Sequence, residues 1–156
     1  MPNFWNFISS YGIIALFVLG ALVIWRTHGV WSTLRYAIVI ILTWFLNGAL
    51  KYLINRPRPF EVGDAQASAA LLVHTPSFPS GHAAAAFAIA TFVFLCVKDS
   101  MSITRPDPIL ATLIILAVLI AVSRVQVGVH YVSDVVAGAI LGIIVSLVAW
   151  RMIKKL

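Results

Sequence analysis

The sequence predicts an all-α integral membrane protein, a bundle of about five transmembrane helices that forms a single domain over residues 1–156. Hydrophobic residues make up 62% of the chain and charged residues only 10%, and the mean hydropathy is +1.01. A soluble domain of this length is far less apolar. The polar residues gather in short stretches between long apolar runs, which is the pattern of helices that cross a bilayer several times.

Five apolar runs define the expected helices, approximately at 8–25, 34–54, 83–97, 109–122 and 135–150. A helix needs about 20 residues to span the hydrocarbon core, with a range of about 17 to 25. The last three runs are short by this measure, so each is expected to extend into the polar residues that flank it. This extension places those polar side chains at the depth of the lipid headgroups.

Local signals indicate where helices begin and where they meet the membrane interface. Asp107 followed by Pro108 is typical of a helix N-cap and first turn. The connection 55–80 contains an alanine-rich piece, residues 65–73, for which we expect a short interfacial helix. This piece could act as a substrate lid or be a plain connector. Tryptophans lie at the ends of the runs, as in an interfacial aromatic belt: Trp5, Trp25, Trp31 and Trp150.

The distribution of cations predicts the orientation. With five spans, one side of the membrane carries Arg26, Arg35, Lys98, Arg105, Arg151, Lys154 and Lys155, and the other carries Lys51, Arg56, Arg58 and Arg124. The first group lies in short loops and the tail, whereas the second lies within or beside the polar motifs. The positive-inside rule therefore places the C-terminus in the cytoplasm, and the N-terminus and the motifs on the outer (periplasmic or extracellular) face of a cell membrane, such as an inner membrane.

The net charge of +6 does not indicate a nucleic-acid partner, because the basic residues are scattered among hydrophobic runs and form no basic face or tail. The one cysteine, Cys96, lies inside an apolar run. A single cysteine excludes a disulfide framework or a thiolate metal site within one chain. No cofactor is expected.

The stretch 123–134 combines an arginine, a histidine and an aspartate beside a membrane segment, where such residues are costly. If the chain is helical from His130, Asp134 lies one turn further on the same face and reaches an imidazole nitrogen. A carboxylate on one ring nitrogen leaves the other available as base or nucleophile. Taken alone, such a pair is more often a helix cap and a surface ion pair.

Residues 79–82, Pro-Ser-Gly-His, come directly before a helix-forming run. Backbone N–H groups at a helix start lack internal partners and attract anions. Ser80 adds a hydroxyl donor, Gly81 lets an oxyanion approach the main chain, and His82 would face the bound group as a proton donor. Taken alone, a capped helix with an interfacial histidine explains this stretch as well.

Cations at the ends of the apolar runs could neutralise such an anion. Arginine's planar fork matches pairs of phosphate oxygens, and lysine acts as a compact point charge. The candidates are Lys51, Arg58 and Arg124, and the alternative is that they snorkel to the headgroup region. For Arg56 we prefer snorkelling.

Three motifs together resemble the signature of the type 2 phosphatidic acid phosphatase superfamily, whose soluble relatives include vanadium haloperoxidases: Lys51-x6-Arg58-Pro59, Pro79-Ser80-Gly81-His82 and Ser123-Arg124-x5-His130-x3-Asp134. All three parts are present in the usual order. Membrane members commonly have six spans, so the five expected here imply that one N-terminal family helix is absent. His28 and His74 match no motif position and are interpreted as loop residues.

The resemblance implies a role for each motif residue. His130 would be the nucleophile that takes the phosphoryl group as a phosphohistidine, and Asp134 would orient it. His82 would protonate the leaving oxygen and then help to activate water. The phosphate oxygens would be bound by Lys51, Arg58, Arg124, Ser80 and the Gly81 amide. No metal is implied, and the sequence shows no carboxylate cluster around the motifs.

The leading hypothesis is an integral membrane phosphatase of lipid phosphates or diphosphates, of the polyprenyl diphosphate or phosphatidylglycerophosphate type. One alternative is a lipid phosphotransferase that uses the same phosphohistidine. Another is a non-catalytic lipid-binding or transport protein on this scaffold, which the intact histidines and aspartate disfavour. A vanadate-dependent peroxidase is disfavoured because the chain is small and membrane-buried. The expected partners are the lipid substrate and the bilayer, and the oligomeric state is left open.

Overall fold

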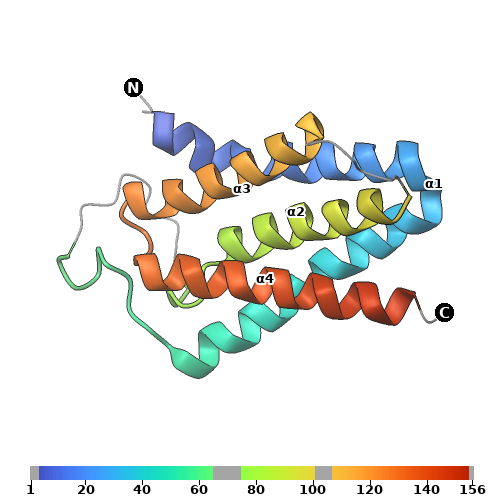
Figure 1. The fold of residues 1–156 in the computed structure, drawn as a ribbon. Helices are drawn as coiled ribbons and strands as arrows, with labels where there is room; N and C mark the ends of the chain where they lie inside the picture. Colours follow the sequence, from blue (N-terminus) through green and yellow to red (C-terminus); the bar gives the residue numbers. More distant parts are fainter. Residues whose placement is uncertain (1–3, 65–74, 101–106, 155–156) are drawn as a thin grey trace.

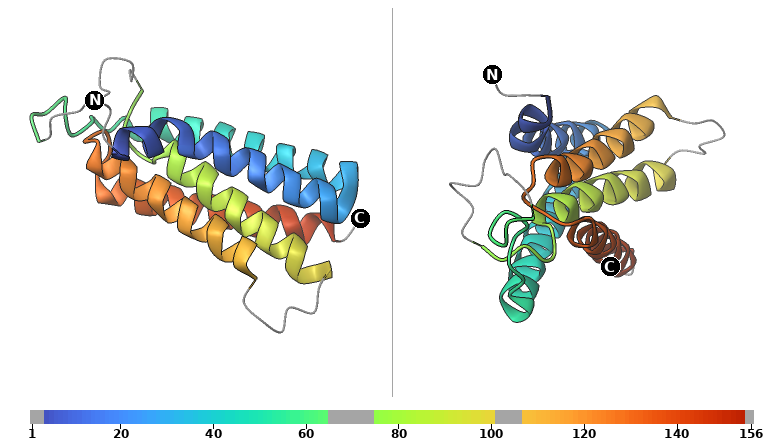
Figure 2. Two further views of the ribbon diagram at one scale, coloured as in Figure 1. Left: turned by 90° about the horizontal axis from the view of Figure 1, so that it is seen from above. Right: turned by 90° about the vertical axis from the view of Figure 1, so that its left-hand side faces the viewer.

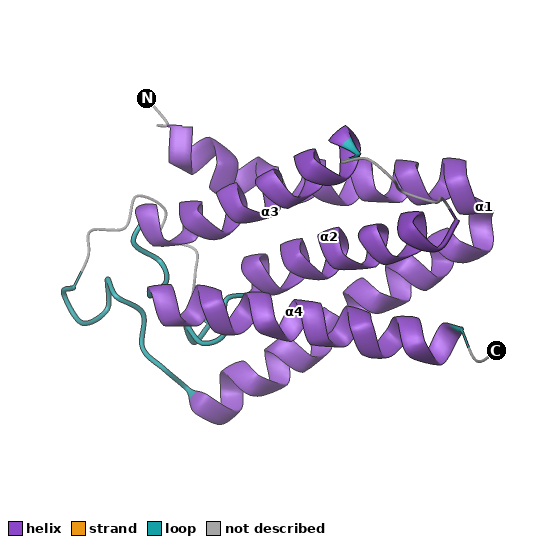
Figure 3. Ribbon diagram, viewed as in Figure 1, coloured by secondary structure: helices purple, strands orange, loops and turns teal. Residues whose placement is uncertain are grey.

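The chain folds into four helices, and Figure 1 shows how they lie beside one another in the computed structural model. The structure describes residues 4–64, 75–100 and 107–154. The helices are α1 (Phe4–Ile54), α2 (Gly81–Ser100), α3 (Pro108–Gln126) and α4 (Val132–Ile153). Within these ranges every regular element is a helix (Figure 3), as the sequence predicts.

α1 is interrupted at Gly29, where the backbone takes φ 75° and ψ −173°. A straight helix of 51 residues would be about 77 Å long, more than twice the thickness of the hydrocarbon core. The chain instead turns back at Gly29, and the two limbs of α1 diverge from this turn along the bundle (Figure 1). They are joined by the Tyr36 hydroxyl, which donates to the Phe17 carbonyl at 2.9 Å. Positive φ at this position favours glycine.

The prediction of about five separate helices is not confirmed. The described residues form four, because the first two predicted runs belong to one helix that resumes directly after Gly29. The interpretation of His28 as a loop residue is therefore wrong: it lies within α1, and its Nε2 atom is 3.0 Å from the Cys96 carbonyl oxygen. The interfacial helix expected at 65–73, and His74, lie outside the described residues.

α3 begins where the sequence predicts. Asp107 is the N-cap, and its Oδ1 atom accepts a hydrogen bond from the Ile109 N–H at 2.8 Å. Pro108 takes the first helical position, where its missing N–H costs no hydrogen bond. The predicted cap is confirmed.

α2 lies at the centre of the bundle and contacts the three other helices (Figure 2). α4 approaches it most closely at two glycines. A Cβ atom on Gly138 would lie 2.4 Å from the Ser80 carbonyl oxygen, and one on Gly142 would lie 2.1 Å from that of Ala84. Small residues let helix backbones pack this closely in membrane proteins. The contact fixes the start of α2 beside the start of α4.

The outside of the bundle is apolar. Large hydrophobic side chains are exposed along α1 and the other helices, among them Trp44, Phe45 and Leu53. All four helices are long and apolar enough to cross a membrane. Hydrocarbon, unlike water, imposes no penalty on such a surface. The chain is a multi-pass membrane protein.

Candidate active site

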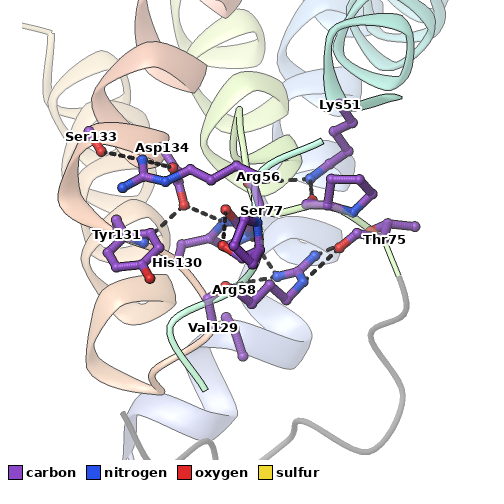
Figure 4. Close-up of polar contacts among 12 residues, drawn as sticks. Lys51, Arg56, Arg58, Thr75, Ser77, Val129, His130, Tyr131, Ser133 and Asp134 are labelled. Carbon is purple, nitrogen blue, oxygen red and sulfur yellow. Dashed lines mark hydrogen bonds and ion pairs between the residues drawn. The ribbon is translucent and has the colours of Figure 1, made fainter. Parts of the chain in front are cut away.

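The three polar motifs meet at one end of the bundle, where α1 ends and α2 and α4 begin (Figure 4). Their polar side chains are buried: Ser80 and Asp134 are 0% exposed, Arg58 is 2% exposed and His130 is 4% exposed. Burial of charged and polar groups is costly unless they are paired. This end of the bundle therefore holds a preorganised polar cluster in an otherwise apolar protein.

His130 lies between a carboxylate and a guanidinium. It lies in the short connection between α3 and α4, and its Nδ1 atom is 3.5 Å from Oδ2 of Asp134, in the first turn of α4. The same Oδ2 accepts the Tyr131 N–H at 3.0 Å, which holds the carboxylate in place. On the other side of the ring, Nε2 is 3.4 Å from NH1 of Arg58. A carboxylate facing Nδ1 favours the tautomer with the proton there, so the Nε2 lone pair faces the cations.

Burial lowers the pKa of His130 to about 4, because charging the ring away from water is unfavourable. The contact with Asp134 raises the pKa and the positive charges of Arg58, Arg124 and Lys51 lower it further, but burial is the largest cause. The imidazole is therefore neutral near pH 7. A neutral ring with a directed lone pair is the form that acts as a nucleophile.

Arg58 is fixed by backbone acceptors from two other segments. Its Nε donates to the Thr75 carbonyl at 2.8 Å, and its NH1 donates to the Val129 carbonyl at 2.8 Å. Burial lowers the pKa of Arg58 below its ordinary value, yet a guanidinium remains charged in proteins. The fork is thus a fixed cation beside Nε2 of His130.

Lys51 and Arg124 bring two more cations from α1 and α3. The Lys51 Nζ atom, in the last turn of α1, donates to the Pro76 carbonyl. The Arg124 NH1 atom contacts the Ser9 hydroxyl, and the Arg124 carbonyl accepts the His130 N–H at 3.2 Å. Each cation comes from a different element, so their convergence is a tertiary feature of the fold.

The N-terminus of α2 also borders the polar cluster. The Ser80 N–H donates to the Asp134 carbonyl at 2.9 Å, which ties the start of α2 to α4. Two buried polar atoms of this cluster have no hydrogen-bond partner among the described residues, Ser80 Oγ and Arg124 Nε. Native proteins rarely leave such groups unpaired, and unpaired groups gathered at one place are typical of a site for a polar ligand.

His82, in the first turn of α2, joins the cluster from the side of a large apolar cavity. It interacts electrostatically with Arg124 and with His130. The cavity has a volume of about 660 Å³, and its wall combines His82, Gly81 and Lys51 with apolar side chains of α1 that include Trp44 and Phe45. One end of the cavity is thus charged, whereas most of its wall is hydrocarbon.

The structure brings together the eight residues proposed from the motifs, through direct contacts, a shared cavity wall or charge interactions.

The interpretation of Arg56 as a snorkelling residue is wrong. Its NH1 atom donates to Oδ1 of Asp134 at 2.8 Å and to Ser133 Oγ at 2.7 Å. The partners are 77 and 78 positions away along the chain, so no local pattern could have indicated the contact. Thr75, which holds Arg58, was missed for the same reason.

The sequence matches the model of the PAP2 superfamily over residues 32–156. The chain belongs to the PAP2 superfamily. This confirms the resemblance drawn from the three motifs, since the matched region contains all of them.

Individual relatives agree with this assignment. The chain is 31% identical over 140 residues to phosphatidylglycerophosphatase B of Bacillus subtilis, which covers 87% of this chain and 64% of the relative. It is 34% identical over 142 residues to an undecaprenyl-diphosphatase of Sulfolobus acidocaldarius, which covers 87% of this chain and 63% of the relative. The chain therefore spans somewhat less than two thirds of the length of these curated relatives.

A solved structure shows the same fold. The crystal structure of a transmembrane PAP2-type phosphatidylglycerolphosphate phosphatase from Bacillus subtilis superposes with a TM-score of 0.71 at 26% sequence identity. The similarity covers 97% of this chain and 74% of that one. The helical arrangement around the motifs is therefore the arrangement of a membrane-embedded PAP2 protein.

Proposed function

We propose that this protein is an integral membrane phosphatase that hydrolyses the phosphomonoester or diphosphate of a lipid through a phosphohistidine intermediate. The observation that carries the proposal is the placement of His130, with a carboxylate 3.5 Å from Nδ1 and a guanidinium 3.4 Å from Nε2. This nucleophile lies among fixed cations beside an apolar cavity. The named relatives act on lipid phosphates and diphosphates.

In the first step, the Nε2 lone pair of His130 attacks phosphorus while the bond from phosphorus to the leaving oxygen breaks. His82 gives its proton to that oxygen, so the lipid leaves as a neutral alcohol or a protonated phosphate. Asp134 stabilises the charge that develops on the imidazole by accepting at Nδ1. The product of this step is a phosphohistidine at Nε2.

In the second step, water replaces the protein as the phosphoryl acceptor. His82, now neutral, takes a proton from a water molecule, whose oxygen attacks phosphorus as the nitrogen–phosphorus bond breaks. His130 returns to its neutral form and inorganic phosphate leaves. The equatorial charge of both transition states is stabilised by donors that are fixed in advance: Lys51, Arg58, Arg124, Ser80 and the Gly81 N–H. The proposal needs no metal, because these side chains supply the positive charge.

The shape of the cavity supports a lipid as the substrate. Its apolar wall suits a hydrocarbon tail, and its charged end suits a phosphate. The names of the relatives make polyprenyl diphosphate and phosphatidylglycerophosphate the candidates. In Figure 1, the chain that follows α1 (residues 55–64) and the C-terminal end of α4 lie at opposite ends of the bundle. Combined with the positive-inside rule, this supports a cytoplasmic C-terminus and an active site at the outer leaflet.

An assay of purified protein in detergent tests the function. Phosphate release is measured over a panel of lipid phosphates and diphosphates, with a chelator present throughout and with vanadate as a competing anion. We expect release from at least one lipid, insensitivity to the chelator and inhibition by vanadate. Release that disappears with the chelator contradicts the metal-free mechanism, and no release from any lipid contradicts the function.

The intermediate can be tested separately. Rapid acid-free quenching of a reaction with ³²P-labelled lipid should leave label on the protein that is stable in base and lost in acid, as expected for a phosphoramidate. His130→Ala should remove the label, whereas a variant at the distant His28 should retain it. Label that persists in His130→Ala would assign the nucleophile to another residue.

A further inference from the structure

The Arg56 side chain reaches the segment that carries the nucleophile and its carboxylate. Arg56 lies two residues after the end of α1, and its NH1 atom donates both to Oδ1 of Asp134 at 2.8 Å and to Ser133 Oγ at 2.7 Å. Its guanidinium carbon is 4.0 Å above the centre of the Tyr131 ring. Figure 4 shows the side chain extended across the start of α4. Arg56 therefore binds the start of α4 through its side chain.

The two carboxylate oxygens of Asp134 have different partners. Oδ2 faces His130 at 3.5 Å and accepts the Tyr131 N–H, whereas Oδ1 accepts from Arg56. A carboxylate that is 0% exposed needs partners at both oxygens, because an unpaired buried charge is strongly unfavourable. Removing the Arg56 side chain leaves Oδ1 of Asp134 without this partner. The Asp134 carboxylate then lowers its free energy by rotating toward other hydrogen-bond donors.

The contact between Asp134 and His130 is long enough to depend on this arrangement. At 3.5 Å it lies at the outer limit of a hydrogen bond. A small rotation of the Asp134 carboxylate would remove the hydrogen-bond acceptor from Nδ1 of His130. The tautomer and the orientation of the imidazole ring would then no longer be fixed. The geometry of the nucleophile is therefore set in part by a residue that does not touch it.

We propose that Arg56 is a positioning residue, which holds Asp134 so that the carboxylate can fix the His130 tautomer with Nε2 toward the phosphate. The catalytic part of this inference rests on the proposed function. The alternative role, direct binding of the phosphate, is disfavoured because NH1 is occupied by Asp134 and Ser133 and the guanidinium is stacked on Tyr131. Three other cations, Arg58, Arg124 and Lys51, already interact electrostatically with His130.

Kinetics distinguish the two roles. Arg56→Gln should lower kcat between about 10- and 100-fold, as expected when a supporting contact of a catalytic group is lost. KM, and the inhibition constant of inorganic phosphate, should stay within about threefold, because the anion-binding side chains are untouched. Arg56→Lys should recover most of kcat, since an ammonium can still donate to Oδ1. The matched control is Arg151→Gln, an exposed cation in the last turn of α4, which should behave as the parent protein.

The outcomes separate cleanly. A parental kcat in Arg56→Gln refutes the positioning role. A weaker inhibition by phosphate, of the size found for Lys51→Gln, shows direct anion binding instead. If Arg56→Gln fails to fold, as judged by circular dichroism and gel filtration in detergent, Ser133→Ala carries the test, because it removes the second acceptor that holds the NH1 atom of Arg56. A lowered kcat in folded Ser133→Ala supports the role, and a parental kcat refutes it.

A second measurement does not need a substrate. With ¹⁵N-labelled histidine, His130 of the parent protein should show one neutral tautomer protonated at Nδ1, and Arg56→Gln should show a mixture of both tautomers. A parent protein that releases no phosphate but shows this Arg56-dependent change refutes the proposed function and supports the positioning role. A single unchanged tautomer in Arg56→Gln refutes the positioning role whatever the activity is.

Discussion

The two ends of the helical bundle contain the same kinds of polar residue in different surroundings. At the motif end, His130, Arg58 and Asp134 are buried and contact one another. At the opposite end, Asp99 and Lys154 form an ion pair with side chains that are 46% and 49% exposed. The opposite end also contains a histidine, His28, whose Nε2 atom lies 3.0 Å from the backbone carbonyl oxygen of Cys96.

This difference between the two ends shows which observations indicate a catalytic or ligand-binding site. An exposed ion pair contributes about 0–1 kcal/mol and is compatible with anchoring or topology. A cluster in which two cations, a histidine and a carboxylate are buried (Arg58, Arg124, His130 and Asp134) has a high desolvation cost, and it persists only where the fold fixes every member. Residue type alone does not distinguish the two ends of the bundle. They differ in how deeply the polar side chains are buried and in how many of them contact one another.

The largest expected effect contrasts the histidines of the two ends. His130→Ala should lower lipid-phosphate hydrolysis by about 10⁴-fold or more, because removal of a nucleophile eliminates the covalent route. His28→Ala should retain activity within a few fold. Initial rates of phosphate release at saturating substrate provide the measurement. Comparable losses in both variants would show that the contrast between the ends does not concern catalysis.

The second prediction concerns the backbone contact that positions the motif end. A Cβ at Gly138 would lie 2.4 Å from the Ser80 carbonyl oxygen, so Gly138→Ala forces α4 away from α2. We expect a loss of about 1–3 kcal/mol in unfolding free energy, with a lower kcat because Ser80 and Asp134 separate. The matched control is Gly48→Ala, where no atom lies within 4 Å of the added Cβ and stability should not fall. Equal thermal stability of the two variants in detergent would contradict the close packing.

The sequence was sufficient for features that depend on local patterns or on the family motifs. The Asp107 cap and the membership of the PAP2 superfamily, which the motifs indicated, belong to this class. It did not predict the form of the reversal in α1, because Arg26, His28 and Gly29 resemble a loop, whereas a single positive φ at Gly29 lets the helix reverse and resume at once. It also failed at Arg56, because pairing with Asp134 joins positions 78 apart and leaves no trace in either segment.

A third prediction follows from the burial of His130, which faces Asp134 as well as the cations Arg58, Arg124 and Lys51. Its pKa is about 4 when folded, against an ordinary value of about 6.5 in the unfolded chain. As pH falls from about 6.5 to about 4, the unfolded state therefore binds a proton that the folded state does not. The unfolding free energy should fall with decreasing pH in this window, at most by about 1.4 kcal/mol per pH unit from this group.

Thermal unfolding in detergent at pH 5 and pH 7 measures this effect. The decrease in midpoint between the two pH values should be smaller in His130→Gln than in the parent, because glutamine does not titrate. An identical decrease in both proteins would mean that the ring of His130 is not held in its neutral form by burial.

The smallest expected effect lies at the opposite end of the bundle. Asp99→Asn removes the charge that pairs with Lys154, and because both side chains are about half exposed, unfolding free energy should change by less than about 1 kcal/mol. The change should shrink at high salt, since exposed pairs are screened, and kcat should be parental. Asp134→Asn makes the same chemical change at 0% exposure and should lower kcat by about 10²-fold or more through loss of the His130 tautomer. If Asp99→Asn lowered kcat to the same degree, the distant end would have to be coupled to the chemistry, and burial would not be the property that separates the two regions.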